Sequence, residues 1–238
     1  MTALLVTGTG TGVGKTVVTA ALAALALARG RRCTVVKPAQ TGVPDGAPGD
    51  LAEVTRLAGP VDPVELARYP DPLSPAAAAR LSGRPPLDPA RCVQAVLDAQ
   101  AGADLVIVEG AGGLLVRYDE DGFTMAELAR TLRLPVLVVC TAGLGTLNTT
   151  ALTLEAMAHR GLELTGLVIG SWPVPPGVAE RSNVADLEML ATRPLLGAIG
   201  AGAGNVSPAA FLDIARRGLG PSLGGSFDAL AFRRRATS

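Results

Sequence analysis

The stretch Thr7-Gly8-Thr9-Gly10-Thr11-Gly12-Val13-Gly14-Lys15-Thr16 follows a short apolar run, residues 3–6, and precedes an apolar segment rich in Ala and Leu, residues 17–29. The run predicts a buried strand, and the segment predicts a helix. A strand, a glycine-rich turn, Gly-Lys-Thr and a helix are together the parts of a phosphate-binding loop. The alternative, a glycine-rich turn of an ordinary α/β protein, leaves the Gly-Lys-Thr sequence unexplained.

The residue types of this stretch suit a polyphosphate ligand. Glycines let backbone N–H groups point inward without Cβ clashes, and the following helix offers unpaired N–H groups and its positive dipole end. Lys15 can reach the β- and γ-phosphates, and the Thr16 hydroxyl can ligate Mg²⁺. The first glycine of the usual pattern would stand at Thr9, whereas here it is Gly8. The predicted nucleotide-binding residues of this stretch are Thr11, Gly12, Val13, Gly14, Lys15, Thr16 and Val17.

Lysine is rare in this chain. Of its 21 basic residues only Lys15 and Lys37 are lysines, and all the others are arginines. Arginine is a broad planar fork, whereas lysine is a compact point charge. The two lysines are therefore expected where only a compact ammonium group fits.

The composition excludes several classes of function. The formal net charge is zero, so no overall basic field attracts nucleic acid, and the basic run 233–235 is interpreted as a solvated end. No basic leader precedes the first strand, and residues 17–27 are too few to span a bilayer, which indicates a cytoplasmic protein without a membrane partner. The three cysteines are widely spaced, as expected of buried thiols in a reducing compartment. A single histidine, His159, argues against a His-dependent triad or a zinc site.

Strand-like and helix-like segments alternate along the chain, and no linker separates two patterns. The alternation predicts one doubly wound α/β domain, residues 1–238, with a mainly parallel sheet flanked by helices. Residues 59–75 are expected to be a Pro-rich connection, and the poorly patterned residues 219–238 a weakly ordered tail. The expected strands are residues 3–6, 33–36, 104–109, 135–140, 164–170 and 195–199. The expected helices are residues 17–29, 51–58, 76–81, 90–101, 125–132, 149–160, 178–191 and 208–217.

Further site candidates follow the expected strands. Lys37 comes after the second strand and leads into a Gly/Pro-rich loop, residues 39–49, at the end of the sheet where ligands bind. Asp50 then starts a helix and is interpreted either as its N-cap or as a metal ligand. Glu109 ends a strand before a glycine-rich turn, as expected of a carboxylate that holds Mg²⁺. The loop 141–148 leads into another helix N-terminus suited to an anion.

Four motifs extend this pattern along most of the chain. They are Gly8-Thr9-x-Thr11-x-Val13-Gly14-Lys15-Thr16, Lys37-Pro38-x-Gln40-Thr41-Gly42, Glu109-Gly110-Ala111-Gly112-Gly113 and Leu144-Gly145-Thr146-Leu147-Asn148-x-Thr150. Their order and spacing over residues 2–217 resemble the dethiobiotin synthetase family, in which the displaced first glycine is also usual. The resemblance implies a homodimeric, Mg-ATP-dependent enzyme of biotin synthesis. Such an enzyme converts 7,8-diaminononanoate and CO₂ to dethiobiotin, with release of ADP and phosphate.

The implied reaction assigns roles to the candidate residues. It brings a carbamate anion against a triphosphate, so positioning and charge neutralisation carry the catalysis. The predicted catalytic residues are Lys15, which neutralises the transferring phosphoryl group, and Lys37, which bridges the carbamate and the γ-phosphate. The implied metal ligands are Thr16, Asp50 and Glu109, and Glu109 and Gly170 join the nucleotide-binding set. The implied substrate contacts are Lys37, Thr41 and Gly112, together with Leu144, Gly145, Thr146, Leu147 and Asn148, which reach the substrate carboxylate from the neighbouring subunit.

The sequence departs from the family pattern in two places. Many relatives carry Asn-His-Thr where this chain has Asn148-Thr149-Thr150, so a histidine is missing beside the expected carboxylate site. The strand that often ends in an adenine-reading Asn is followed here by Gly170-Ser171-Trp172. Loss of that amide predicts weak nucleobase discrimination, with other nucleoside triphosphates accepted beside ATP. Trp172 either stacks on the base or packs against the protein.

Other classes of nucleotide-binding protein fit the residues less well. A MinD/ParA-like switch carries a second lysine in the phosphate loop, where this chain has Gly10. A glutamine-dependent amidoligase of the same superfamily needs a Cys-His module, for which His159 alone leaves little room. A non-catalytic nucleotide-binding module has no need of paired acidic residues and a second lysine.

Overall fold

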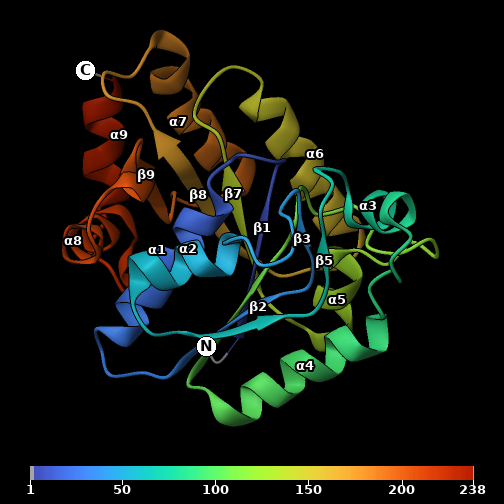
Figure 1. Cartoon of the computed structure of the whole chain (residues 1–238). Coiled ribbons are helices and arrows are strands. Elements are labelled where there is room, and N and C mark those ends of the chain that lie inside the picture. Colours follow the sequence, from blue (N-terminus) through green and yellow to red (C-terminus); the bar gives the residue numbers. More distant parts are fainter. Residues whose placement is uncertain (1–2, 238) are drawn as a thin grey trace.

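The computed structural model describes residues 3–237, and Met1, Thr2 and Ser238 lie outside the described residues. A seven-stranded sheet with the order β4-β2-β6-β1-β7-β8-β9 forms the centre of the molecule (Figure 1). All its strand pairs are parallel, which confirms the predicted doubly wound α/β fold. The strands are β1 Ala3–Gly8, β2 Cys33–Lys37, β4 Asp62–Glu65, β6 Leu105–Glu109, β7 Val136–Cys140, β8 Leu164–Trp172 and β9 Gly197–Gly200. A separate two-stranded sheet pairs β3 Gln40–Thr41 with β5 Arg68–Tyr69.

Helices cover both faces of the sheet (Figure 1). On one face, α1 Lys15–Leu27 lies between the strands and the outer helices α2 Asp50–Ala58 and α8 Pro208–Gly218. A helix that is apolar all round belongs in such an inner position, and residues 18–26 of α1 are all buried. The other face carries α4 Pro89–Gly102, α5 Met125–Leu132, α6 Thr146–His159 and α7 Val178–Ala191. Helix α3 Pro75–Ser82 packs against the small sheet.

The sheet topology brings the candidate residues to one edge. The chain passes from β1 to β2 and β4 on one side of the sheet, returns to β6, and then continues through β7, β8 and β9 on the other side. The carboxyl ends beside β1 therefore form a topological switch point. Val6 on β1 is level with Glu109 on β6, and Val36 on β2 is level with Val108. Lys37 and Glu109 therefore end neighbouring strands beside the phosphate loop.

Two sequence-based expectations differ from the structure around residues 50–65. The expected connection 59–75 contains β4, an edge strand that includes Pro63; an edge strand tolerates proline because one side of its backbone has no partner. Asp50 is the first residue of α2 rather than its N-cap, and the cap is Gly49. The Asp50 side chain is therefore available for other contacts.

The C-terminal segment also differs from the expected weakly patterned tail. It forms η2 Pro221–Leu223 and α9 Ala229–Thr237, and α9 packs against α7 (Figure 1). The rings of Phe232 and Trp172 meet edge to face with centroids 4.8 Å apart, and Phe227 lies next to Phe232. Aromatic pairs at this spacing add to the stability of the contact. Trp172 thus packs against the protein in this structure.

None of the helices within residues 3–237 has both the length and the apolar character needed to cross a membrane.

Candidate functional site

A cleft of about 620 Å³ opens at the carboxyl ends of the central strands. The phosphate loop and the start of α1 form one wall, and Lys37, Asp50 and Glu109 lie at its centre. The opposite wall is more apolar and comes from the segment before α3 and from Val116. The lining residues are Thr11, Gly12, Gly14, Lys15, Thr16, Val17, Lys37, Gln40, Thr41, Asp50, Pro72, Leu73, Ser74, Pro75, Glu109, Gly110, Ala111, Gly112 and Val116.

The phosphate loop has the backbone conformation that its glycines permit. Gly12 and Gly14 have φ values of 73° and 97°, in the left-handed region that other residues avoid, and Gly14 caps α1. The Lys15 ammonium donates a hydrogen bond to the Gly10 carbonyl at 2.8 Å, inside the loop. Burial and the nearby charge of Lys37 lower the pKa of Lys15 to about 8. A phosphate group would supply the negative charge that this ammonium lacks.

The displaced glycine of the loop has a steric reason. A Cβ at Gly8 would lie 2.6 Å from Cγ2 of Val13 and 3.2 Å from Cδ of Lys15. The side chains of Val13 and Lys15 therefore fold back over the end of β1, and only glycine leaves room for them. Thr9 occupies the position of the usual glycine, and its backbone N–H donates a hydrogen bond to the Val139 carbonyl on β7.

Lys37 joins the two acidic residues of the cleft. Its Nζ lies 2.5 Å from Oδ2 of Asp50 and 2.8 Å from Oε1 of Glu109, and the Lys37 and Glu109 side chains are only 3% and 1% exposed. Burial by itself would lower the pKa of Lys37, but the carboxylates of Glu109 and Asp50 outweigh it and raise that pKa above its ordinary value. Lys37 is therefore a permanent cation at the centre of the cleft.

The acidic residues and Thr16 fit a magnesium ion. The Thr16 hydroxyl donates to Oε1 of Glu109 at 2.8 Å, and within residues 3–237 no group donates a hydrogen bond to the buried Oε2 of Glu109. Such an oxygen needs a partner, because burying a charged acceptor without one is costly. Mg²⁺ usually takes one or two carboxylates and completes its shell with water and substrate phosphates. Among the described residues there is no group of three or more acidic, His or Cys side chains that could hold a metal ion.

The glycine-rich turn after β6 is fixed from below by Tyr118. The Ala111 N–H donates to the Tyr118 hydroxyl at 2.5 Å, and burial raises the pKa of this phenol to about 12. Gly112 has a φ of 69°, and its Cα lies so close to Val116 that a Cβ would approach Cγ2 to 2.9 Å. These contacts fix the position of the turn, whose backbone lines the cleft.

Residues 141–148 do not line this cleft in the single chain, and the last three of them form the first turn of α6, which begins earlier than the sequence predicted. The Thr146 hydroxyl donates to the Thr141 carbonyl at 2.7 Å, and Nδ2 of Asn183 on α7 donates to the carbonyls of Ala142 and Gly143 at 2.8 and 3.0 Å. The loop is therefore held rigidly at the N-terminus of α6. Leu144 at its tip is 95% exposed, an unusual position for a large apolar side chain.

The structure brings together most, but not all, of the predicted site residues. Val13 and Gly170 do not line the cleft; Gly170 lies behind the loop, where a Cβ would be 2.0 Å from the Val13 carbonyl oxygen. The residues 144–148 are likewise absent from the described lining. Sequence reasoning did not assign Gln40 or the wall around Leu73 to the site. Gln40 could have been found from its motif with Lys37 and Thr41, whereas the residues 72–75 carried only a Pro-rich signal.

The fold is shared with nucleotide-dependent ATPases of low sequence identity. The structure of the septum site-determining protein MinD with Mg-ADP from Pyrococcus horikoshii superposes with a TM-score of 0.57 at 18% identity, covering 99% of this chain and 94% of that one. A ParA family ATPase from Chlorobium tepidum gives a TM-score of 0.56 at 14% identity, covering 99% and 98%. A family model described as an AAA domain matches residues 2–202. The parallel sheet, the phosphate loop and the acidic residue at the end of β6 define a P-loop NTPase.

Sequence relatives give the family within that class. The ATP-dependent dethiobiotin synthetase BioD of Parafrankia sp. is 63% identical over 99% of both chains, and that of Streptomyces coelicolor is 56% identical over 98% of both. This chain belongs to the ATP-dependent dethiobiotin synthetase family, the ligases of biotin biosynthesis. The family resemblance inferred from the four motifs is confirmed.

Proposed function

We propose that this chain closes the ureido ring of dethiobiotin from 7,8-diaminononanoate, CO₂ and ATP. The observation that carries the proposal is the position of Lys37. Its ammonium group lies between Asp50 and Glu109 in the same cleft as Lys15, so two cations converge where two anionic reactants must meet. Positioning and charge neutralisation are what phosphoryl transfer requires of a protein.

The reaction proceeds in three balanced steps. One amine of the diamine attacks the carbon of CO₂ and loses a proton, which gives a carbamate. A carbamate oxygen attacks the γ-phosphorus of ATP, and the bond to ADP breaks. The second amine then attacks the carbamoyl carbon and loses a proton, and phosphate leaves with the bridging oxygen.

The residues of the cleft divide these tasks. Lys15 neutralises the transferring phosphoryl group, and Lys37 bridges carbamate and γ-phosphate oxygens in exchange for part of its present contact with the carboxylates. Thr41 and Gly112 contact the carbamate end, and the apolar wall around Leu73 and Val116 accommodates the hydrocarbon chain. Val13 and Gly170 act as support for the phosphate loop rather than as direct contacts.

Thr16, Glu109 and Asp50 would hold Mg²⁺ with ATP. The bound ion would supply charge stabilisation on the β- and γ-phosphate oxygens. The buried, unpartnered Oε2 of Glu109 supports this assignment, since a phosphate-bound cation would satisfy it. Thr16 already lies at hydrogen-bond distance from the same carboxylate, so its hydroxyl needs little movement to serve as a ligand.

The substrate carboxylate is bound by residues 144–148 of a second copy of the chain. Two features support a homodimer: residues 144–148 do not line the cleft of their own chain, and two large apolar side chains, Leu144 before α6 and Leu152 on α6, are exposed. The N-terminus of α6 offers backbone N–H groups to a carboxylate. A two-fold interface would present each loop to the partner's cleft.

Mixing two inactive variants tests the shared site. Lys37→Arg damages the cleft, and Gly145→Val damages the loop because Gly145 has a φ of 91° that a β-branched residue resists. If the site is shared, a mixed dimer contains one site with both parts intact, so equal mixing after subunit exchange should restore about a quarter of the wild-type turnover. If each chain uses its own loop, mixing restores nothing, and the shared site is wrong.

Weak nucleobase discrimination is expected from the end of β8. Residues 170–177 contain no amide side chain, and the next amide, Asn183, is engaged by the carbonyls of Ala142 and Gly143. Without an amide that hydrogen-bonds the edge of the base, the site should discriminate only weakly between nucleobases. Turnover with ATP, GTP, CTP and UTP should agree within about tenfold. A preference for ATP of several hundredfold would contradict this expectation.

The proposed activity is tested by phosphate release from Mg-ATP and bicarbonate, with and without 7,8-diaminononanoate. Phosphate release that depends on the diamine, with a cyclic urea of the mass of dethiobiotin, is the expected result. A parallel reaction in excess EDTA should release none. Hydrolysis that is indifferent to the diamine would overturn the proposal and favour a nucleotide-dependent switch.

A further inference from the structure

Arg68, the first residue of β5, is not among the residues that line the cleft, yet it holds the loop between β3 and α2. Its guanidinium binds both carboxylate oxygens of Glu65, with Nε–Oε1 and Nη2–Oε2 distances of 2.6 and 2.8 Å. The other terminal nitrogen, Nη1, donates to the carbonyls of Ala47 and Pro44 at 2.7 and 3.2 Å. Arg68 therefore ties the loop 42–49 to the neighbouring segment of β4 and β5.

We propose that Arg68 is a positioning residue. By holding the loop 42–49, it fixes the positions of Thr41 and of the Asp50 carboxylate in the cleft. The proposal rests on the function proposed above, because it concerns the efficiency of that same cleft. Thr41, the last residue of β3, directly precedes the loop, and Asp50, the first residue of α2, directly follows it; both line the cleft. Fixing the loop at Pro44 and Ala47 therefore fixes the separation of two site residues.

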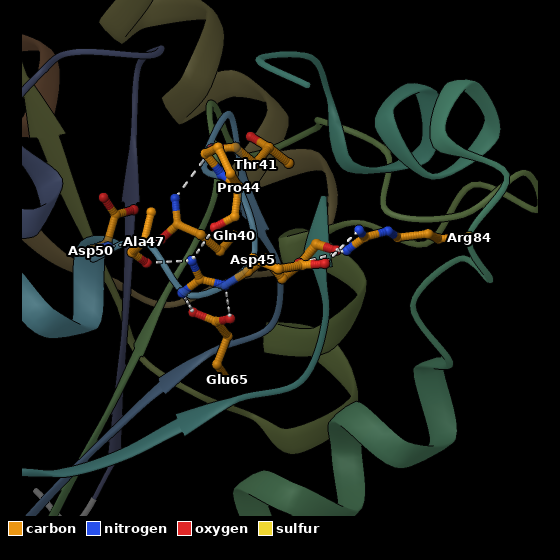
Figure 2. A network of polar contacts seen from close by, with 9 residues as sticks. Gln40, Thr41, Pro44, Asp45, Ala47, Asp50, Glu65 and Arg84 are labelled. Carbon is orange, nitrogen blue, oxygen red and sulfur yellow. Dashed lines mark hydrogen bonds and ion pairs between the residues drawn. The ribbon is translucent and has the colours of Figure 1, made fainter. Parts of the chain in front are cut away.

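Gln40 transmits this constraint to the cleft. Figure 2 shows Gln40 between Thr41 and the start of α2, with Ala47 and Glu65 on the side away from Thr41. Oε1 of Gln40 accepts the Asp50 N–H at 2.8 Å, and its Nε2 donates to the Thr41 carbonyl at 3.1 Å. Gly49 fits tightly in between, since a Cβ there would lie 2.7 Å from Oε1 of Gln40 and 3.1 Å from Nη2 of Arg68. Gly49, at the end of the loop, is thus packed between Gln40 and Arg68.

Asp50, which Gln40 holds through its backbone N–H, contacts the central lysine of the site. Asp50 Oδ2 lies 2.5 Å from Nζ of Lys37, so a shift at the start of α2 changes the carboxylate that orients this ammonium. No movement of the phosphate loop follows, because that loop is held by β1 and α1. Loss of Arg68 should therefore impair the use of the diamine more than the binding of nucleotide.

A second arginine also contacts the loop, but from the solvent side. Arg84 pairs with Asp45 at 2.7 Å and donates to the Arg68 carbonyl at 2.9 Å, as Figure 2 shows for the Asp45–Arg84 pair. The side chains of Arg84 and Asp45 are 36% and 66% exposed, against 21% and 22% for Arg68 and Glu65. Exposed ion pairs contribute little, whereas a largely buried guanidinium that donates four hydrogen bonds is hard to replace. Arg68 is therefore the main restraint.

The test compares Arg68→Ala and Arg68→Lys with the wild type. Lysine keeps the charge but cannot bind the carboxylate by two points and reach both carbonyls. Arg130→Lys is a matched control, because Arg130 also pairs with a glutamate three residues earlier, Glu127, on the exposed side of α5. For each protein, kcat, the KM values for diamine and ATP, and the affinity for Mg-ADP are measured. Arg68→Ala is assayed again with added guanidinium ion.

The expected result for Arg68→Ala is a loss of about 10²-fold in kcat/KM for the diamine, with nucleotide affinity unchanged, since small misplacements of reacting groups cost about this much. Arg68→Lys should retain part of the activity, and guanidinium should restore part of the activity of Arg68→Ala. Equal losses for the diamine and for Mg-ADP, or kinetics like those of Arg130→Lys, would overturn the proposal.

Amide hydrogen exchange supplies a readout that does not depend on turnover. Peptides covering residues 42–50 should exchange faster in Arg68→Ala, while those of the phosphate loop keep their rates. Unchanged exchange in residues 42–50 would overturn the positioning role even if the proposed reaction is correct. Faster exchange with no diamine-dependent turnover in the wild type would place the failure in the proposed function instead.

Discussion

Replacing Lys37 by arginine is expected to lower kcat for dethiobiotin formation by about 10²- to 10³-fold, the usual effect of losing one correctly placed hydrogen-bond donor at a reacting centre. The charge is kept, so the expected loss comes from shape. The Lys37 ammonium lies within 2.8 Å of both Asp50 and Glu109 and is almost completely buried. A planar guanidinium in that space must displace one carboxylate or turn away from the reactants.

The measurement is single-turnover formation of dethiobiotin alongside Mg-ADP affinity by calorimetry. Nucleotide affinity should stay within a few-fold of the wild-type value, because arginine still balances the charges of Asp50 and Glu109. Lys37→Met is a harsher comparison: it leaves two acidic groups without their cation, and breaking a buried pair costs about 3–5 kcal/mol of stability. Near-normal turnover of Lys37→Arg would show that Lys37 does not bridge the reactants.

Replacing Gly170 by alanine is expected to displace the phosphate loop. The added Cβ would lie 2.0 Å from the Val13 carbonyl oxygen and 2.7 Å from Cγ1 of Val139. Gly14 of the phosphate loop is equally close to β8, since a Cβ on Gly14 would lie 2.6 Å from the Gly170 carbonyl oxygen. Backbone cannot move as a side-chain end can, so either β8 or the loop must shift. Overpacking of this severity should cost about 3 kcal/mol or more.

Thermal unfolding and nucleotide binding together test this contact. In a chain of this length such a loss corresponds to a fall in Tm of about 10 °C, and affinity for ATP should fall with it. Gly200→Ala is the control, because Gly200 lies in the neighbouring strand β9 with no atom within 4 Å of its Cβ position. An unchanged Tm and affinity for Gly170→Ala would show that the loop and β8 do not depend on this close approach.

In the proposed reaction, the balance of charges in the cleft changes when the reactants bind. Two ammonium groups and two carboxylates meet there, and Lys37 is paired with both acids. ATP and a carbamate would add negative charge, which Lys15 and Lys37 are placed to receive. Burial and the neighbouring Lys37 cation lower the pKa of Lys15, because both disfavour its positive charge. A bound anion would favour that charge.

The sequence alone determined the elements whose signals are local. The phosphate loop, Lys37 and Glu109 were predicted because each stands at the end of a buried apolar strand, in a short motif of fixed spacing. In a parallel sheet the carboxyl ends of strands share one edge, so local order along the chain already implied that these residues meet. The doubly wound sheet followed in the same way from the alternation of apolar runs.

Only the tertiary structure decided which residues meet across long separations. Pro63 in β4, the Phe232–Trp172 contact and the helix α9 depend on a sheet edge and on packing that no local pattern records. The same holds for Gly170 beneath the phosphate loop, for Tyr118 beneath Ala111 and for Arg68 beneath the loop 42–49. Each supports a site residue from a segment distant in sequence, where hydrogen-bond geometry and steric exclusion act only once the chain is folded.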